Sequence, residues 1–312
     1  MPAVTREEPH LPPTRQTMHL AAAFVRLTRP KFLVGGFAGF ALGAAIAAYE
    51  GAPLTLAHYL AGQAMVTAFH LMVHYANDFF DHAGDRHGEP TAFSGGSGVL
   101  VSGALAPSVA LCAALACAGL GLAFVAGFAL AGQPVSAGIG AAIGLLAWFY
   151  SAPPLRLAAR GWGEADTALV VAVLVPLAGY AAFTGTIDAR ALAATLAPAT
   201  AMFAMMLAVE WPDRAADAAG GKRNLLVRRG PAAAGRLATG AALSIVPALG
   251  AAIWWGAPWP SAVFALLLVP FVAGYIGWFR APRTADELAA RGVALFLLTV
   301  VFELFGYLAV LR

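Results

Sequence analysis

The amino-acid sequence predicts an all-α membrane protein of about nine transmembrane helices in one bundle. Of its 312 residues, 60% are hydrophobic and only 11% are charged. A soluble domain carries about 25% charged residues, so we expect this chain to lie in a bilayer. Apolar runs recur along the chain, and the basic residues gather on alternate connections between them.

The N-terminal residues 1–26 precede the first apolar run and contain four prolines together with charges of both signs. They lack the continuous apolar core and the small-residue cleavage site of a secretory signal. We therefore expect a disordered or surface-lying tail over 1–26 and a transmembrane domain over 27–312.

The candidate spans follow from the length of the apolar runs. A membrane-spanning helix needs about 20 mostly apolar residues. Apolar runs between polar breaks give nine candidates, at 31–49, 54–76, 105–131, 135–152, 166–184, 190–209, 232–256, 259–280 and 292–311. The long polar loops over 77–104, 153–165 and 210–231 then fall on one face, and we expect the active-site residues there.

The basic residues predict the orientation. Of the 19 Lys and Arg residues, 17 fall on the face that carries the N-terminus, and only Arg190 and Arg312 fall on the other. Because cytoplasmic loops carry the excess of basic residues, the sequence predicts a multi-pass protein of the inner (cytoplasmic) membrane with a cytoplasmic N-terminus. No dense basic run interleaves with aromatics, so nucleic acid is not an expected partner, whereas the lipid bilayer is.

Two aspartate clusters fall on the predicted cytoplasmic face. In the first, Asp78, Asp81 and Asp85 follow Asn77 at the end of the second expected span. If that helix continues past the bilayer, the three carboxylates lie at i, i+3 and i+7 on one stripe.

The second cluster follows the sixth expected span, with Asp213 and Asp217 at i and i+4. Stacked carboxylates repel one another unless a cation lies between them, and Mg²⁺ prefers carboxylate oxygens together with substrate phosphates. Two opposed stripes are therefore expected to hold a diphosphate through Mg²⁺. The alternative is that these aspartates only solubilise two helix ends.

Three further segments on this face carry polar groups. Lys222 and Arg223, on a glycine turn, could neutralise a departing diphosphate, or they could be ordinary basic loop residues. Ser94 and Ser97 could offer hydroxyl and backbone N–H groups to an anion, or form a connector.

The fourth expected span ends near Tyr150 and Arg156. The Tyr150 ring could stabilise a carbocation or anchor the helix at the interface, and Arg156 could hold a phosphate or a carboxylate. Within the apolar spans, His70 and His74 could make interhelical hydrogen bonds or help to deprotonate a hydroxyl. Glu303 requires a partner that the sequence does not identify.

These motifs resemble a known family. Asn77-Asp78-x-x-Asp81-x-x-x-Asp85 and Asp213-x-x-x-Asp217-x-x-x-x-Lys222-Arg223 together resemble the paired signatures of the UbiA superfamily of intramembrane prenyltransferases, over about residues 24–312. Three further segments resemble the branch that contains the 1,4-dihydroxy-2-naphthoate polyprenyltransferases: Thr28-Arg29-Pro30-Lys31, the loop from Ser94 to Ser97, and the segment from Tyr150 to Arg156.

The resemblance implies Mg²⁺-dependent transfer of a prenyl group from an isoprenoid diphosphate to an aromatic acceptor, namely 1,4-dihydroxy-2-naphthoate in menaquinone biosynthesis. The implied Mg²⁺ ligands are Asp81, Asp85, Asp213 and Asp217. The implied catalytic residues are Asp81, Asp213, Lys222 and Tyr150. The implied substrate-binding residues are Asn77, Asp78, Arg29, Arg156, Arg223, Ser94 and Ser97. The sequence departs from the family at Glu210, where many relatives have asparagine, and at Pro154, where the 4-hydroxybenzoate branch has lysine.

Other functions stay open at this point. The acceptor could be 4-hydroxybenzoate, a chlorophyllide or a glycerol phosphate. A transporter is the rival class, because His70, His74 and Glu303 could form a proton relay, although a transport site is expected near the bilayer midplane. The sequence leaves the prenyl chain length and the oligomeric state open.

Overall fold

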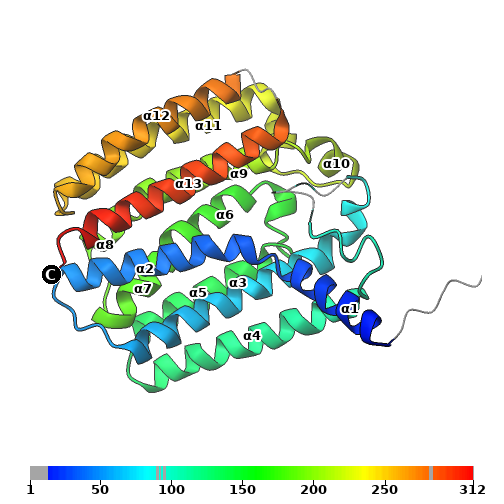
Figure 1. Cartoon of the computed structure of the whole chain (residues 1–312), viewed down its shortest axis with the longest axis horizontal. Coiled ribbons are helices and arrows are strands. Elements are labelled where there is room, and N and C mark those ends of the chain that lie inside the picture. Colours follow the sequence, from blue (N-terminus) through cyan, green and yellow to red (C-terminus); the bar gives the residue numbers. More distant parts are fainter. Residues whose placement is uncertain (1–12, 89–90, 92, 94–95, 281–283, 312) are drawn as a thin grey trace, which may run out of the picture.

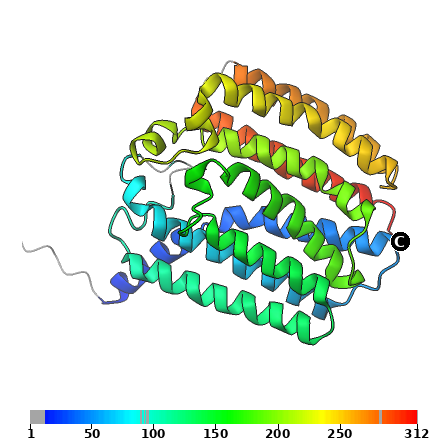
Figure 2. The same ribbon diagram turned by 180° about the vertical axis from the view of Figure 1, so that it is seen from behind.

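The computed structural model describes residues 13–88, 91, 93, 96–280 and 284–311, and these contain helices and no strand. The long helices run side by side along the molecule (Figures 1 and 2). We call one end, where α10 lies at the right of Figure 1, the aspartate end, because Asp78, Asp81, Asp85, Asp213 and Asp217 lie there. The opposite end, where the C-terminus lies, is the far end.

Within the described residues, each expected span corresponds to a helix or to a run of consecutive helices. These are α2 (Leu33–Tyr49), α3 (Leu56–Asp85), α4 (Pro107–Leu130), α5 (Pro134–Phe149), α6 (Gly163–Leu169) with the π-helical turn η3 (Val170–Leu174) and α7 (Val175–Thr184), α8 (Ala189–Ala194) with α9 (Leu196–Val209), α11 (Leu225–Trp254), α12 (Pro260–Arg280) and α13 (Ala285–Leu308). The remaining elements are α1 (Pro13–Thr28), η1 (Pro30–Phe32), η2 (Ala158–Arg160) and α10 (Arg214–Ala219).

Seven helical segments of the described chain are long and apolar enough to cross a membrane. The helices α3 and α5 are not among them. The α5 helix has only 16 residues, and polar side chains such as His58, Gln63 and His70 interrupt the apolar part of α3. The all-α, polytopic architecture predicted from composition is confirmed.

Several helices extend beyond the expected apolar runs. The α3 helix continues to Asp85, which places the first aspartate cluster on a helix. The α11 and α13 helices begin earlier than expected, each behind a capping side chain, because the Asn224 and Thr284 side chains accept hydrogen bonds from backbone N–H groups in the first turn. Such caps offset the unpaired N–H groups of a helix start, and apolar content alone does not reveal them.

The N-terminal segment, expected to be disordered or to lie on the surface, contains a helix. Residues 13–28 form α1, an amphipathic helix that exposes Met18 and Val25 and buries Ala23 and Leu27. Residues 1–12 lie outside the described residues.

The outer surface of the bundle is apolar. Leucines with half or more of their area exposed include Leu115, Leu122, Leu130 and Leu266, on α4 and α12. An exposed leucine costs no free energy of hydration when it contacts lipid tails instead of water.

Two glycines let α2 and α7 meet backbone to backbone. A Cβ atom at Gly43 would lie 1.8 Å from the carbonyl oxygen of Pro176, and one at Gly179 would lie 2.2 Å from the carbonyl oxygen of Phe40. Small residues at such crossings are a common means of packing membrane helices.

We expect Gly43→Ala to destabilise the bundle, because the added methyl group meets backbone atoms that no rotamer change can move. Overpacking typically costs about 1–3 kcal/mol, and a backbone clash belongs at the upper end of that range. The measurement is the thermal midpoint of the protein in detergent. Gly127→Ala is the matched control, because no heavy atom lies within 4 Å of the new Cβ in α4. Equal midpoints for the two variants would contradict this interpretation.

The far end is fastened by a group of polar contacts, which we call the far-end clamp (Glu50, Tyr180, Arg190 and the Trp255 carbonyl). Arg190 Nη1 lies 3.0 Å from Glu50 Oε1, and the Tyr180 hydroxyl donates to Glu50 Oε2 at 2.5 Å. Arg190 Nε also donates to the carbonyl oxygen of Trp255 at 3.3 Å. The clamp thus joins the ends of α2, α7, α8 and α11.

Candidate active site

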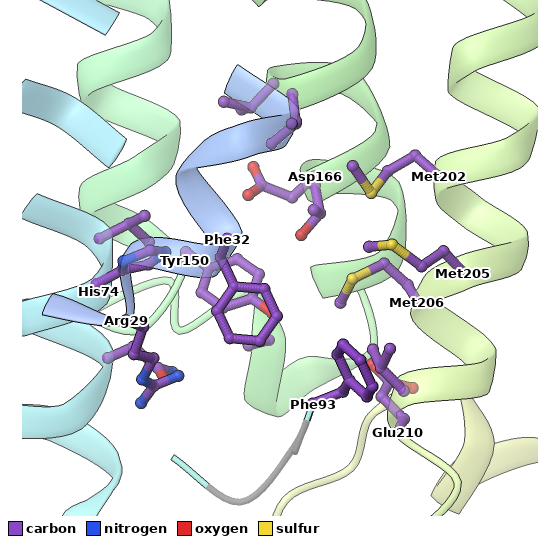
Figure 3. A pocket seen from close by; sticks show the side chains of 18 of the residues that line it. Arg29, Phe32, His74, Phe93, Tyr150, Asp166, Met202, Met205, Met206 and Glu210 are labelled. Atoms are coloured by element: carbon purple, nitrogen blue, oxygen red, sulfur yellow. The ribbon is translucent and has the colours of Figure 1, made fainter. Parts of the chain in front are cut away.

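A cavity of about 310 Å³ opens at the aspartate end between α2, α3, α5, α6, α9 and α13 (Figure 3). Its lining divides by chemistry into two parts. The charged part comprises Arg29, Lys31, Asp85, Asp213, Asp217 and Lys222. The apolar part comprises Val170, Val171, Met202, Met205, Met206, Val209, Val293, Phe296 and Leu297. The cavity can therefore hold a molecule with an anionic head and a hydrocarbon tail.

Lys222 lies among carboxylates from both aspartate clusters. Its Nζ atom is 3.0 Å from Asp81 Oδ2, 3.5 Å from Asp85 Oδ1 and 3.5 Å from Asp217 Oδ1. A turn after α10 holds the lysine, with the backbone N–H of Lys222 donating to the Asp217 carbonyl at 2.8 Å. The two clusters predicted to oppose each other do meet, and a cation of the chain lies between them.

The approach of α10 to α3 depends on two glycines. A Cβ atom at Gly220 would lie 3.2 Å from the Cα atom of Gly84. This close passage brings Asp217 toward the stripe that begins at Asp78.

Burial and charge act in opposite directions on these groups. Burial would lower the pKa of Lys222, but attraction to Asp81, Asp217 and Asp85 outweighs it, so the pKa lies above the ordinary lysine value. Burial raises the pKa of Asp217, an effect that Lys222 opposes. Lys222 therefore stays charged within the cavity.

A second cation, Arg29, forms an ion pair with Asp78. Ser97 donates its hydroxyl hydrogen to the same carboxylate. Asp78 and Asp81 are only 3% and 6% exposed and lie behind the cavity wall, covered by Arg29 and Lys222 respectively. The first motif thus anchors two cations that face the cavity.

Two asparagines orient carboxylates of the site. Asn77 Nδ2 donates to Asp81 Oδ2 at 2.9 Å and to Ser151 Oγ at 3.0 Å. Asn224 Nδ2 donates to Asp217 Oδ2 at 2.8 Å while its Oδ1 atom caps α11. Asn224 and Ser151 were not predicted as site residues. The position of Asn224 directly before a helix was the available signal.

Tyr150 and the histidines line the wall beside the charged part. The side chain of Tyr150 makes a hydrogen bond with Thr167. His74 donates from Nδ1 to the Thr28 carbonyl at 2.9 Å, and the His70 ring lies 4.8 Å from the His74 ring. For His74, the interhelical hydrogen bond is the interpretation that the contacts favour.

Glu210, at the end of α9, lines the cavity and makes a hydrogen bond with Glu164. Burial, and next the Glu164 carboxylate, raises the pKa of Glu210 well above its usual range. Glu164 Oε1 in turn accepts the backbone N–H of Leu225 at 2.6 Å. The raised pKa favours the protonated, neutral form of Glu210.

Some predicted site residues do not reach the cavity. Arg156 and Arg223 are exposed and are absent from the described lining. The Arg223 backbone N–H donates to the Ala159 carbonyl at 2.8 Å, which turns the chain between α10 and α11. Ser94 lies outside the described residues. Glu303 is 1% exposed, and neither carboxylate oxygen has a hydrogen-bond partner among the described residues.

The donor atoms fit Mg²⁺ that arrives with a phosphate. No three His, Cys, Asp or Glu side chains of the described chain form a complete metal site. The Lys222 ammonium lies among the nearest carboxylates. Mg²⁺ is usually held by one or two carboxylates together with phosphate oxygens and water. Asp85, Asp213 and Asp217 line the cavity and offer such ligands from two helices.

Comparison with known proteins agrees with this geometry. The model of the UbiA prenyltransferase family matches residues 37–300. No curated protein matches the sequence.

Several solved structures share the fold. A UbiA homologue from Archaeoglobus fulgidus bound to DMAPP and Mg²⁺ is 18% identical, with a TM-score of 0.69 over 92% of this chain and 99% of that chain. The apo structure of a UbiA homologue from Aeropyrum pernix K1 is 15% identical, with a TM-score of 0.67 over 88% of this chain and 97% of that chain. A structure of digeranylgeranylglyceryl phosphate synthase is 15% identical, with a TM-score of 0.63 over 95% of this chain and 99% of that chain.

Proposed function

The chain belongs to the UbiA prenyltransferase family, and we propose that it transfers a prenyl group from an isoprenoid diphosphate to 1,4-dihydroxy-2-naphthoate in a Mg²⁺-dependent reaction. The observation that carries this proposal is the meeting of both aspartate clusters around Lys222 at the mouth of an apolar cavity. That arrangement suits a diphosphate head with an isoprenoid tail. The A. fulgidus homologue has been solved with DMAPP and with GPP, in each case with Mg²⁺.

In the proposed mechanism, Arg29 and Lys222 bind the diphosphate and stabilise the negative charge that grows on it. Fixed charges aimed at a leaving group lower the barrier because they need no reorganisation during the reaction. Mg²⁺, held by Asp85, Asp213 and Asp217, would supply further positive charge to the phosphate oxygens. The bond between C1 of the prenyl group and the diphosphate oxygen breaks, and its electron pair leaves with the diphosphate.

The apolar wall then protects the allylic cation. Met202, Met205 and Met206 line one side of the cavity and exclude water, which would otherwise capture the cation. The Tyr150 ring can stabilise the positive charge through its π face. For a hydroxynaphthoate acceptor, the ring carbon that bears the carboxylate forms the new bond to C1. The bond from that carbon to the carboxylate then breaks, CO₂ leaves, and the electron pair restores the aromatic ring.

Contacts between the branch motifs support the naphthoate acceptor. Arg29, from the Thr-Arg-Pro-Lys segment, and Ser97, from the serine–glycine loop, both bind Asp78. Tyr150, which opens the third branch segment, lines the same cavity. The three segments that resemble the dihydroxynaphthoate branch thus converge on one place.

We also propose that the aspartate end faces the cytoplasm of a cell with this protein in its inner membrane. The support is the excess of basic residues on the connections at that end. A single cysteine placed at exposed Arg223 in a cysteine-free variant should be protected from an impermeant maleimide in intact cells and labelled after lysis. Labelling in intact cells would show the opposite orientation and overturn this proposal.

The function is tested with purified protein in detergent, Mg²⁺ and geranyl diphosphate, by mass spectrometry of the products. Separate reactions contain 1,4-dihydroxy-2-naphthoate, 4-hydroxybenzoate, a chlorophyllide or glycerol 1-phosphate. We expect product only in the reaction that contains 1,4-dihydroxy-2-naphthoate. EDTA should abolish product formation, and added Mg²⁺ should restore it. Transfer only to another acceptor would overturn the acceptor but keep the reaction, and no transfer to any of them would overturn both.

A further inference from the structure

One carboxylate in the cavity has no role in the mechanism described so far. Asp166, on α6, lines the cavity, is 7% exposed, and its Oδ1 atom has no hydrogen-bond partner in the described part of the chain. Figure 3 shows Asp166 among the lining side chains, with the side chains of Arg29 and His74 on one side of it and the methionines Met202, Met205 and Met206 of α9 on the other. It lies apart from both aspartate clusters in the sequence.

A buried carboxylate oxygen without a partner is costly. A polar group that loses its water without gaining a hydrogen bond destabilises the protein by about 1–3 kcal/mol, and by more when it is charged. While the cavity contains water, that water can solvate Asp166. Once substrates fill the cavity, the water leaves and the oxygen needs a donor from the substrate.

The prenyl donor cannot supply that hydrogen bond. Its diphosphate is anionic and is repelled by a carboxylate, and its isoprenoid tail is a hydrocarbon without an N–H or O–H group. The neighbouring polar lining residue Thr167 already makes a hydrogen bond with Tyr150. A hydroxyl group of the second substrate can supply this hydrogen bond.

We infer that Asp166 accepts a hydrogen bond from a hydroxyl group of the acceptor, so that it positions the ring and selects hydroxylated acceptors. This inference rests on the proposed function. In this arrangement Asp166 contacts the hydroxyl group of the acceptor and so fixes the orientation of the ring. The ring carbon that forms the new bond is a different atom, which Asp166 does not contact. An acceptor whose hydroxyl is methylated offers no donor and is disfavoured.

The test compares Asp166→Asn and Asp166→Ala with the unchanged protein, using geranyl diphosphate, Mg²⁺ and 1,4-dihydroxy-2-naphthoate. Asparagine keeps an acceptor oxygen without the charge, and alanine removes it. Since hydrogen bonds to charged groups are the stronger ones, we expect KM for the naphthoate to rise about 5-fold for the Asn variant and about 30-fold for the Ala variant. KM for geranyl diphosphate stays unchanged.

The second arm uses the two monomethyl ethers of the naphthoate. The unchanged protein should discriminate against one ether by about 10-fold or more, and Asp166→Ala should lose that discrimination. Glu303→Gln is the matched control, because it also converts a buried carboxyl without a hydrogen-bond partner but lies outside the cavity lining. Its two KM values should match those of the unchanged protein.

The outcomes separate the two claims. If the unchanged protein transfers no prenyl group to any hydroxylated acceptor, the proposed function fails and this inference fails with it. If transfer occurs but both Asp166 variants keep the naphthoate KM and the ether discrimination, the inference alone is overturned. A parallel rise in both KM values, or an equal effect of Glu303→Gln, also overturns it by indicating a general structural change.

Discussion

Asp81→Asn is expected to reduce kcat for prenyl transfer by about 10²–10³-fold, the range seen when one preorganised electrostatic contact is lost. Asp81 is buried, pairs with Lys222 at 3.0 Å and accepts a hydrogen bond from Asn77. The amide keeps the shape of the side chain but removes the charge that fixes Lys222 toward the diphosphate. The measurement is the turnover rate at saturating Mg²⁺, geranyl diphosphate and acceptor, with the thermal midpoint recorded alongside.

Asp286→Asn is the matched control for that experiment. Asp286 also lies at the aspartate end, in the first turn of α13, but it is exposed and absent from the cavity lining. We expect near-normal turnover. Full activity of the Asp81 variant would contradict the prediction. An equal loss in the Asp286 variant would also contradict it, because the effect would then not depend on the contact with Lys222.

Lys222→Ala should lower kcat/KM for the prenyl diphosphate by about 10²-fold or more. The ammonium is the common partner of three carboxylates from two helices, so its removal takes away a cation that faces the leaving group and leaves the carboxylates to repel one another. Lys222→Arg should recover part of the activity, because charge is retained while the compact ammonium geometry is lost.

The adjacent Arg223→Ala provides the control for Lys222. Both residues belong to the same basic pair in the sequence, yet Arg223 is exposed and its described contact is through the backbone N–H. We expect this variant to retain most of the activity in the same assay. Comparable losses at both positions would mean that the pair acts through net charge instead of through the contacts of Lys222.

Much of this site could be predicted because its spacing is local. Asp78, Asp81 and Asp85 follow helical intervals within eight residues, and α3 continues far enough to use those intervals. Lys222 likewise follows Asp217 by only five residues, and the glycine turn between them brings the two side chains together. Short-range periodicity was enough to indicate both aspartate clusters of the candidate site.

The cavity wall was not predictable in the same way. Its residues come from helices and connections that lie far apart in the sequence. Helices that are apolar on all sides also give no periodic signal to separate a cavity face from a lipid face. Met202 and Leu266 look alike in the sequence, yet one lines the cavity and the other is 70% exposed on the outer surface. Asp166 was missed because a lone acidic residue near a helix start usually needs no further explanation.

The departures from the family pattern were visible in the sequence. The structural reason for the departure at Glu210 was not visible there. Glu210 makes a hydrogen bond with Glu164, and its pKa is raised by burial and then by that neighbour. A neutral carboxyl group can donate and accept hydrogen bonds, as an asparagine side chain does. The raised pKa of Glu210 favours this neutral form, which reduces the negative charge that the substitution brings to the cavity.

The far-end clamp has a consequence for how the bundle moves. Glu50, Tyr180 and Arg190 hold helix ends together at one end, whereas the other end surrounds a cavity. Helices restrained in this way are expected to tilt about the restrained end, so the amplitude of their motion increases toward the cavity. Entry of a substrate would then occur by spreading of the aspartate end on the microsecond-to-millisecond timescale of collective helix motion, and the clamp would set the pivot.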